Sequence, residues 1–176
     1  MSEGDIGLWS VPLAILGGAI RVSTPFIFVS LGECLTERSG RINLGLEGVL
    51  VFGAMSGYAV AYETGSPWAG VLAAAAAGSL FGLLHGLLCS LKRVNDIAIG
   101  ISLMLLGMGL AFFFGKPYIQ PVAPDLPAIS FGWWSETPQV VAALRVNVLF
   151  IAGAVLAVAM AWMFRSTRLG LAIRVV

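Results

Sequence analysis

Charged side chains are scarce in this sequence. Only 11% of its 176 residues are Asp, Glu, Lys or Arg, whereas ordinary globular domains carry about 25%. Hydrophobic residues make up 59% of the chain, and its mean hydropathy is +0.94. This composition excludes an ordinary soluble domain and predicts an integral membrane protein. The formal net charge of +1 provides no polybasic surface, so no nucleic-acid partner is expected.

Cysteine and histidine are almost absent. The chain has two cysteines, Cys34 and Cys89, and one histidine, His85. These are too few for a disulfide framework or for the usual spacings of a metal site. We expect free thiols and a hydrogen-bonded structural histidine. Because no Ser-His-Asp or Cys-His arrangement has a soluble context to support it, the sequence predicts no catalytic residue and no metal site.

A phosphate-binding loop is also missing. Segment 109–116 has a glycine and a lysine at its ends, but the spacing departs from that of a P-loop and Pro117 replaces the required Ser or Thr. We therefore expect that the chain does not hydrolyse ATP. Its first seven residues include Glu3 and Asp5 and no basic residue, so they lack the n-region of a cleavable signal peptide.

Long apolar runs fill most of the chain. A spanning helix needs about 20 apolar residues, and five segments have roughly this length: 11–31, 44–62, 67–91, 97–114 and 146–164. They predict an all-α, polytopic transmembrane bundle of about five spanning helices in a single domain, 1–176. The proline-rich connection 115–144 is expected outside the membrane, and its residues 138–144 could form a short helix. Its two tryptophans, Trp133 and Trp134, suit the membrane interface.

Basic residues indicate the orientation, since cytoplasmic loops are enriched in Lys and Arg. Seven of them fall in the connections and tail assigned to one side: Arg38, Arg41, Lys92, Arg93, Arg165, Arg168 and Arg174. The opposite side has Lys116 and Arg145. The N-terminus is therefore expected outside and the C-terminus in the cytoplasm.

The stretch 24–54 contains an unusual interruption between two apolar runs. A charged turn, Glu37-Arg38-Ser39-Gly40-Arg41, is followed by Asn43-Leu44-Gly45-Leu46-Glu47-Gly48. Helices broken at membrane depth expose backbone groups that can serve a transport pathway. We therefore predict a broken or re-entrant region near 36–48. Asn43 has the residue type of a helix N-cap.

Several ionisable residues lie in or near the apolar runs. Glu47 either complements the dipole of the following helix and the nearby Arg41, fixes the broken helix as a strut, or contacts the pathway. Arg21, within the first run, either snorkels outward or pairs inside the bundle. Glu33 and Glu37 are expected to form interfacial ion pairs.

Small residues recur at intervals of four in two of the apolar runs. Gly78, Gly82 and Gly86 form one such row, which Ala74 and Ser90 extend. Gly53, Gly57 and Ala61 form the other. Such rows let helix backbones approach closely in lipid. Both are therefore expected to be helix-packing surfaces, and neither indicates a cargo.

The stretch 24–54 resembles the N-terminal signature of permease subunits of bacterial ABC importers. The likeness is to the nucleoside and simple-sugar branch of the ribose and branched-chain amino acid permease superfamily. Two further blocks, Val94-Asn95-Asp96-Ile97-Ala98-Ile99-Gly100 and Thr167-Arg168-Leu169-Gly170-Leu171-Ala172-Ile173-Arg174, are similar to its fourth segment and to the start of its ATPase-coupling region.

The resemblance implies roles for particular residues and for partners. It implies pathway or broken-helix roles for Asn43, Gly45, Glu47, Gly48 and Gly100. It implies ATPase contact for Thr167, Arg168, Gly170 and Arg174. A second permease subunit, an extracytoplasmic binding protein and cytoplasmic ATPase subunits that bind ATP and magnesium would complete the complex in the bacterial plasma membrane. The chain itself would hold no cofactor.

Two departures from the family accompany the resemblance. Met104 stands where relatives often have asparagine, and relatives are roughly twice as long, so the chain is expected to be the N-terminal portion of a permease. The choice among nucleosides, pentoses, hexoses and other small polar solutes stays open. A non-transporting membrane protein and a stand-alone secondary carrier or channel are the alternatives.

Overall fold

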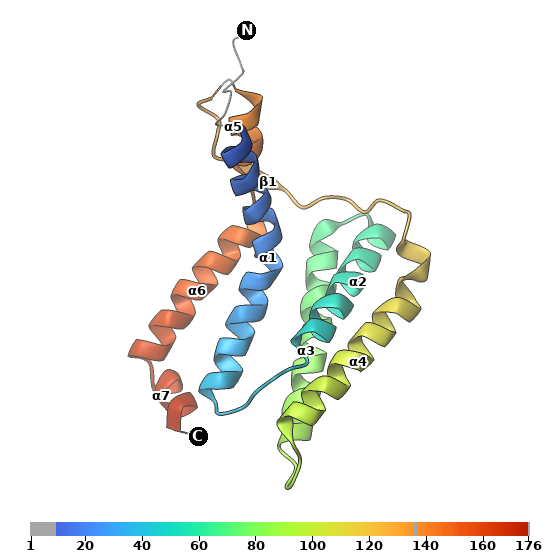
Figure 1. Ribbon diagram of the computed structural model, residues 1–176, viewed down its shortest axis with the longest axis vertical. Coiled ribbons are helices and arrows are strands. Elements are labelled where there is room, and N and C mark those ends of the chain that lie inside the picture. The colour runs from blue at the N-terminus through green and yellow to red at the C-terminus, as the bar shows by residue number, and fades with distance from the viewer. Residues whose placement is uncertain (1–9, 136, 176) are drawn as a thin grey trace. The chain divides into compact units, whose positions relative to one another are not determined.

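The structure is a computed structural model that describes residues 10–135 and 137–175 of the chain (Figure 1). It is mostly helical, which confirms the predicted all-α class. The elements in chain order are α1 Ser10–Arg38, α2 Leu46–Thr64, α3 Pro67–Cys89, α4 Asp96–Gly115, the 3-10 helix η2 Lys116–Tyr118, β1 Ala128–Ser130, α5 Pro138–Ala143, β2 Arg145–Asn147, α6 Val148–Ser166 and α7 Arg168–Val175.

Four helices of the described chain are long and apolar enough to cross a membrane. They occupy Val11–Arg38, Pro67–Cys89, Asp96–Tyr118 and Val148–Ser166. The fifth long helix, α2, has 19 residues and a glutamate near each end, which lowers its hydropathy. The prediction of about five spanning helices is thus met by length, but only four of the five qualify by composition.

Short local signals set the helix boundaries. Proline occupies the first turn of α3, where its missing N–H costs nothing, and Gly65 ends α2 in the left-handed conformation with φ of 67°. The Asn95 side chain accepts hydrogen bonds from the N–H groups of Ile97 and Ala98 at the start of α4. Asn147 caps α6 in the same way through Leu149. These caps satisfy N–H groups that a helix end leaves unpaired.

The chain divides into two compact units, which we describe separately. In the unit formed by Gly32–Asp125 and the residues from Ile173, α2 packs between α3 and α4 (Figure 1). Its core is thin and consists largely of small side chains, with the rings of Phe52 and Phe81 5.3 Å apart. The buried hydrophobic residues of these helices are Ala61, Ala77, Phe81, Cys89, Leu103 and Ala111.

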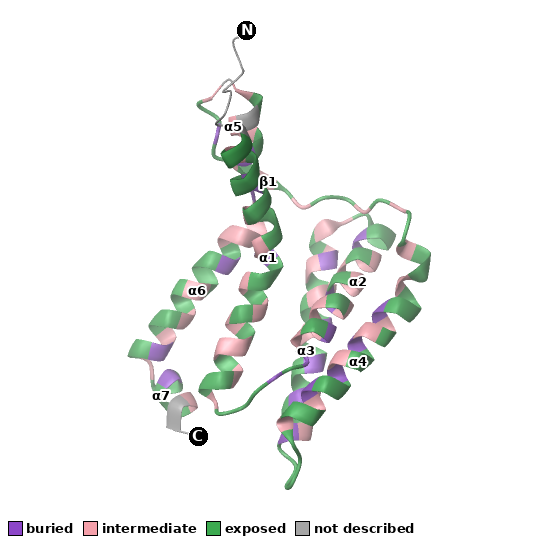
Figure 2. Ribbon diagram, viewed as in Figure 1, coloured by how far each residue is buried: buried purple, intermediate pink, exposed green. Residues whose placement is uncertain are grey.

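Large apolar side chains cover the outside of these helices. Leu72, Leu80 and Phe112 are 71%, 62% and 76% exposed, and Figure 2 shows exposed residues along every long helix. A water-soluble protein seldom exposes extended apolar surface of this kind. The arrangement fits helices whose surroundings are lipid.

The other unit comprises residues up to Leu31 together with Leu126–Ala172. Here α1 and α6 lie side by side, and Gly153 of α6 packs on Ile27 and Phe28 of α1. Strands β1 and β2 pair antiparallel, with Ile129 opposite Val146. Strand β1 lies in the connection 115–144 expected outside the membrane, whereas β2 follows it and includes the first residues of the predicted run 146–164. The sequence patterns did not reveal this ladder. The short helix α5 of the connection lies within the range 138–144 suggested by the sequence.

Candidate functional site

The predicted interruption lies between α1 and α2, over residues 39–45. Gly40 adopts a left-handed conformation with φ of 77°. Its N–H donates to the Glu37 carbonyl, and the Arg41 N–H donates to the Thr36 carbonyl. This pair of bonds is a Schellman motif, which ends a helix at a residue that favours glycine. Because α1 continues to Arg38, the interruption is shorter than the predicted range 36–48.

After this turn the chain runs without helical structure along the first turn of α4. Arg41 Nη1 forms an ion pair with Asp96, at 2.9 and 3.1 Å from its two carboxylate oxygens. A Cβ placed on Gly100 would lie 2.8 Å from the backbone nitrogen of Leu44. Asp96 and Gly100 are four residues apart, which is about 6 Å along a helix. The start of α2 is therefore about one turn further along the bundle than the start of α4.

Side chains satisfy the backbone of this non-helical segment. Asn43 is 8% exposed, and its Oδ1 accepts a hydrogen bond from the Gly45 N–H at 2.9 Å. The Asn43 N–H donates to Glu33 Oε1 at 3.3 Å, and the Thr36 hydroxyl donates to Glu33 Oε2 at 2.9 Å. Irregular backbone at membrane depth requires such pairing within the protein or an aqueous cavity.

The structure contradicts two sequence-based interpretations, those for Asn43 and Glu33. Gly45, not Asn43, is the N-cap of α2, and Asn43 instead forms an Asx turn with Gly45 because its oxygen bonds the N–H two residues on. Glu33 was expected in an ion pair, yet its carboxylate accepts from Asn43 and Thr36.

Glycines bring the start of α2 into close contact with α4. A Cβ on Gly48 would lie 2.5 Å from the Met104 carbonyl oxygen, and one on Gly107 would lie 2.5 Å from the Gly48 carbonyl oxygen. A Cβ on Gly45 would lie 3.0 Å from the carbonyl oxygen of Gly100. Asn43, Gly45, Gly48 and Gly100 are thus gathered at one place. We call these four residues the α2 entry site.

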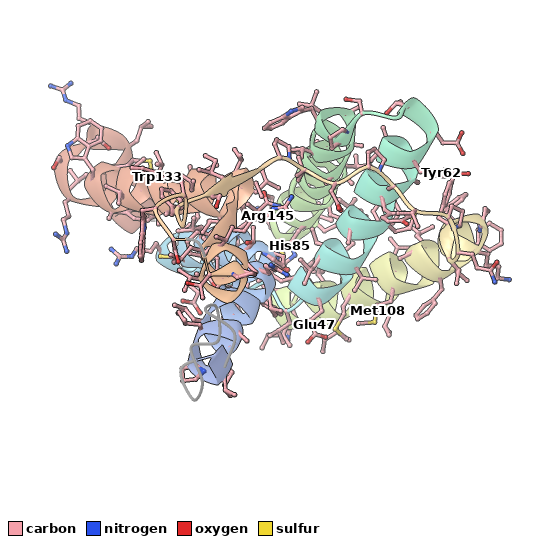
Figure 3. The ribbon with its side chains drawn as sticks, turned by 90° about the horizontal axis from the view of Figure 1, so that it is seen from above. Glu47, Tyr62, His85, Met108, Trp133 and Arg145 are labelled. Atoms are coloured by element: carbon pink, nitrogen blue, oxygen red, sulfur yellow. The ribbon has the colours of Figure 1, made fainter. Side chains whose placement is uncertain are left out.

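Glu47 is next to the entry site in sequence, but its side chain is exposed, whereas the four residues of the entry site are buried. It lies in the first turn of α2 (Figure 3) and is exposed. Its position fits the helix-dipole interpretation. The alternative in which Glu47 also complements Arg41 is wrong, because the Arg41 guanidinium is bound to Asp96, 55 residues away along the chain.

The residues assigned to ATPase contact surround the junction of α6 and α7. The Thr167 hydroxyl donates to the Met163 carbonyl at 2.8 Å, and the Gly170 N–H donates to the Thr167 hydroxyl oxygen at 3.2 Å. A Cβ on Gly170 would collide with the backbone of Met163 and Phe164. Thr167 and Gly170 therefore shape the turn, whereas Arg168 is exposed. Arg174 lies in α7, and its side chain is outside the described part of the structure.

The predicted packing glycines of α3 have few neighbours in the described chain. A Cβ on Gly78 would lie 4.0 Å from Val49, and a Cβ on Gly82 or Gly86 would meet no described atom within 4 Å. The close approach of α3 to α2 is made by Gly70, whose Cβ would lie 2.5 Å from the Gly57 carbonyl oxygen. A packing role for Gly78, Gly82 and Gly86 stays a prediction.

The histidine and one cysteine form a buried pair in the last turns of α3. His85 and Cys89 are 5% and 4% exposed, and His85 Nε2 lies 3.5 Å from Cys89 Sγ. His85 Nδ1 has no hydrogen-bond partner among the described residues. Cys34 and Cys89 are both free thiols. No group of three potential metal ligands occurs in the part of the chain that the structure describes.

Tyr58 and Glu63 of α2 form hydrogen bonds with the segment that follows α4. The Tyr58 hydroxyl donates to the Pro121 carbonyl and accepts from the Ala123 N–H at 3.2 Å, while the Tyr118 hydroxyl donates to Glu63 at 3.2 Å. A cavity of about 640 Å³ lies here. Its lining residues are Tyr62, Lys116, Pro117, Ile119, Gln120 and Pro121.

Sequence reasoning did not find three contacts that hold the entry site and the segment before it, made by Glu33, Asp96 and Gly107. Glu33 and Asp96 bond to partners 10 and 55 residues away, so no local spacing reveals them. Gly107 had a usable signal, because Gly100 and Gly107 are seven residues apart and therefore lie on one face of α4.

These features define a multi-pass helical membrane protein whose second long helix is preceded by an irregular, glycine-lined segment. The chain belongs to the family described as branched-chain amino acid transport system / permease component, which it matches over residues 10–176. This confirms the family resemblance drawn from the stretch 24–54. The family description names a transport permease, not an enzyme.

Three curated relatives resemble the chain. One, from Haloferax volcanii, is named as a candidate glucose ABC transporter permease protein and is 34% identical over 122 residues, or 69% of this chain and 37% of the relative. The guanosine ABC transporter permease protein NupQ of Bacillus subtilis is 32% identical over 108 residues, 58% of this chain and 34% of its own. The nucleoside ABC transporter permease protein NupC of Lactococcus lactis is 31% identical over 127 residues, 69% of this chain and 40% of its own.

The matched region spans little more than a third of these relatives, between 34% and 40% of their length. No solved structure matches the chain.

Proposed function

We propose that this chain forms part of the membrane-spanning permease of an ATP-driven importer for nucleosides or simple sugars. The observation that carries the proposal is the entry site, where a non-helical segment packs on α4 with Asn43 and Gly45 buried. Its backbone is satisfied by Asn43 and Glu33 instead of by helical bonds. Irregular backbone within the membrane costs stability, because its polar groups lack helical hydrogen bonds. Transporters use such segments to present polar groups to a solute.

The chemistry of the entry site suits an uncharged, hydroxylated solute. The first N–H groups of α2 carry the positive end of its dipole, and the Asn43 amide and the Glu33 carboxylate add donors and acceptors. The three relatives carry names that refer to glucose, guanosine and nucleosides. All of these solutes contain a hydroxylated sugar ring, which is the substrate class we assign.

The proposed complex contains further subunits. A second permease subunit would complete the pathway, and an extracytoplasmic binding protein would deliver the solute. Cytoplasmic subunits would bind ATP and magnesium and contact α7, where Arg168 and Leu171 are exposed. The bacterial plasma membrane is the proposed location.

The test is uptake of radiolabelled guanosine and glucose by proteoliposomes that contain the chain with its permease, ATPase and binding-protein partners. We expect uptake of at least one of the two solutes, only with ATP on the ATPase side. ATP-independent uptake by the chain alone would favour a secondary carrier or channel. Absence of uptake with all partners present would favour a non-transporting protein.

A variant pair connects the uptake to the entry site. Gly45→Ala places a Cβ 3.0 Å from Asn43 Oδ1 and from the Gly100 carbonyl oxygen, whereas Gly53→Ala, on the same helix, meets its nearest atom at 3.8 Å. Uptake should fall in the first variant and persist in the second. Equal uptake by both variants would separate the entry site from transport.

A further inference from the structure

A cluster of aromatic side chains stands exposed on the unit that contains α1 and α6. It occupies the turn that follows β1, where Phe131, Trp133 and Trp134 are 50%, 84% and 66% exposed. The turn is ordered by its neighbours, since the Phe131 N–H donates to the Leu144 carbonyl at 3.0 Å and a Cβ on Gly132 would lie 3.0 Å from Val141 Cα. Three large aromatic rings on a well-packed turn need an apolar or interfacial environment.

The packing of α1 on α6 gives the level of this turn relative to the membrane. Figure 1 shows the two helices side by side and running in the same direction. Gly153 contacts Ile27 and Phe28, so Val148, where the span of α6 begins, is level with about Val22 of α1. The N-terminal part of α1 thus extends beyond the end of α6.

The aromatic turn packs on α5 through Gly132 and Val141, and α5 in turn contacts this extension of α1. A Cβ on Gly17 would lie 2.9 Å from Ala143 Cα, and Arg21 Nη2 donates to the Ala142 carbonyl oxygen at 3.2 Å. Gly17 precedes Val22 by five residues, which is about 7.5 Å of helix. A bilayer about 30 Å thick in its hydrocarbon core and 40–45 Å overall leaves about 5–8 Å for each headgroup layer. With the start of α6 placed at the edge of the hydrocarbon core, the turn lies at headgroup depth.

Two exposed cations share this level. Arg21 lies on the extension of α1, and Arg145 is paired with Ser130 at the base of the ladder. Each guanidinium has five N–H donors in a planar fork that suits phosphate oxygens. Tryptophan and arginine together are typical of the membrane–water boundary, where the rings sit among headgroups and the guanidinium reaches phosphate.

We propose that Phe131–Trp134, with Arg21 and Arg145, is an interfacial anchor that inserts into the phospholipid headgroup layer at the N-terminal ends of α1 and α6. The connection is then a membrane-bound element and not a solvated loop. It fixes the level of α1 and α6 in the bilayer and acts independently of any transported solute. Figure 3 labels Trp133 and Arg145, one member of each group.

The test measures the depth of Trp134 in the full chain reconstituted into phosphatidylcholine vesicles. Trp9, Trp68, Trp133 and Trp162 are replaced by Phe, so that Trp134 alone fluoresces. We expect lipids brominated near the headgroup to quench it about twofold more strongly than lipids brominated near the chain end. Quenching by iodide alone would place the turn in water. Protection from both kinds of quencher would place it under protein. Either result overturns the proposal.

A matched control and a milder variant keep the test decisive. A variant that retains only Trp162, which is 63% exposed within the span of α6, should be quenched by the brominated lipids and protected from iodide. If the multiple substitution prevents folding, single replacements in the otherwise unchanged chain are compared. Trp134→Phe should remove part of the quenching by shallow bromine. Trp68→Phe, which removes a ring from the first turn of α3 at the end of a candidate span, shows the loss expected of an interfacial tryptophan. No loss with Trp134→Phe would contradict the anchor.

Discussion

At the scale of residues, three kinds of contact hold the entry site and the segment before it: an ion pair, close glycine contacts and an Asx turn. The ion pair of Arg41 and Asp96 ties the non-helical segment to α4, but the two side chains are 47% and 20% exposed, so water and salt screen their attraction. The glycine contacts and the Asx turn are buried. We therefore expect glycine and asparagine substitutions to have larger effects than loss of the ion pair.

The closest of these contacts is at Gly48. Gly48→Ala should destabilise the protein by about 1–3 kcal/mol, because overpacking forces backbone shifts and the nearest atom of α4 is 2.5 Å from the new Cβ. Melting temperatures in detergent measure the change. Gly53→Ala is the control, with its nearest atom at 3.8 Å. Equal melting temperatures for the two variants would contradict the packing of α2 on α4.

The Asn43 side chain offers a second prediction. Asn43→Ala leaves the buried Gly45 N–H without its acceptor, which should cost about 1–3 kcal/mol. Asn43→Ser retains an oxygen at a similar position and should recover part of the loss. The measurement is again the melting temperature. An alanine variant as stable as the serine variant would show that the Asx turn contributes nothing.

At the scale of elements, the interruption depends on where α1 ends. Gly40→Ala forces a Cβ into the left-handed region, at a cost of about 1–2 kcal/mol. Its control is Gly32→Ala within α1, where the added Cβ meets no described atom within 4 Å and helix propensity favours alanine. We expect opposite shifts in melting temperature. A shift in the same direction would contradict the Schellman motif.

The elements themselves were largely predictable from the sequence. Apolar length located all five long helices, since a helix in lipid must satisfy its own backbone over about 20 residues. The predicted first run stopped at 31, whereas α1 continues to Arg38, because apolar composition marks the hydrocarbon core and not the end of the helix. The β1–β2 ladder has three residues in each strand, too few to produce a periodic pattern.

The entry site was predictable in position but not in its contacts. Glycine, asparagine and carboxylate between two apolar runs indicated the interruption. The partner of Arg41 could not be read from spacing, because Asp96 reaches it only after two intervening helices reverse the chain. The glycine row of α3 was an equally regular pattern, yet the close approach to α2 in the described chain is at Gly70. Regular spacing shows that a face can pack, not which helix packs on it.

At the scale of the whole molecule, a transport pathway through the entry site requires that the interruption faces water at membrane depth. Exposed apolar residues on the long helices indicate a lipid environment, as at Leu80, which is 62% exposed. A residue that lines a transport pathway in the same protein would instead be in contact with water. The difference between these two surroundings can be measured directly.

The decisive measurement is thiol accessibility at Leu44, which is 47% exposed beside the entry site. Both native cysteines are replaced by alanine, and Leu44→Cys is compared with Leu80→Cys in the assembled complex in vesicles. A small charged thiol reagent should modify position 44 and not position 80, and the transported nucleoside or sugar should slow the reaction. If position 44 is as unreactive as position 80 on both sides of the membrane, the interruption is sealed from water and the account is wrong.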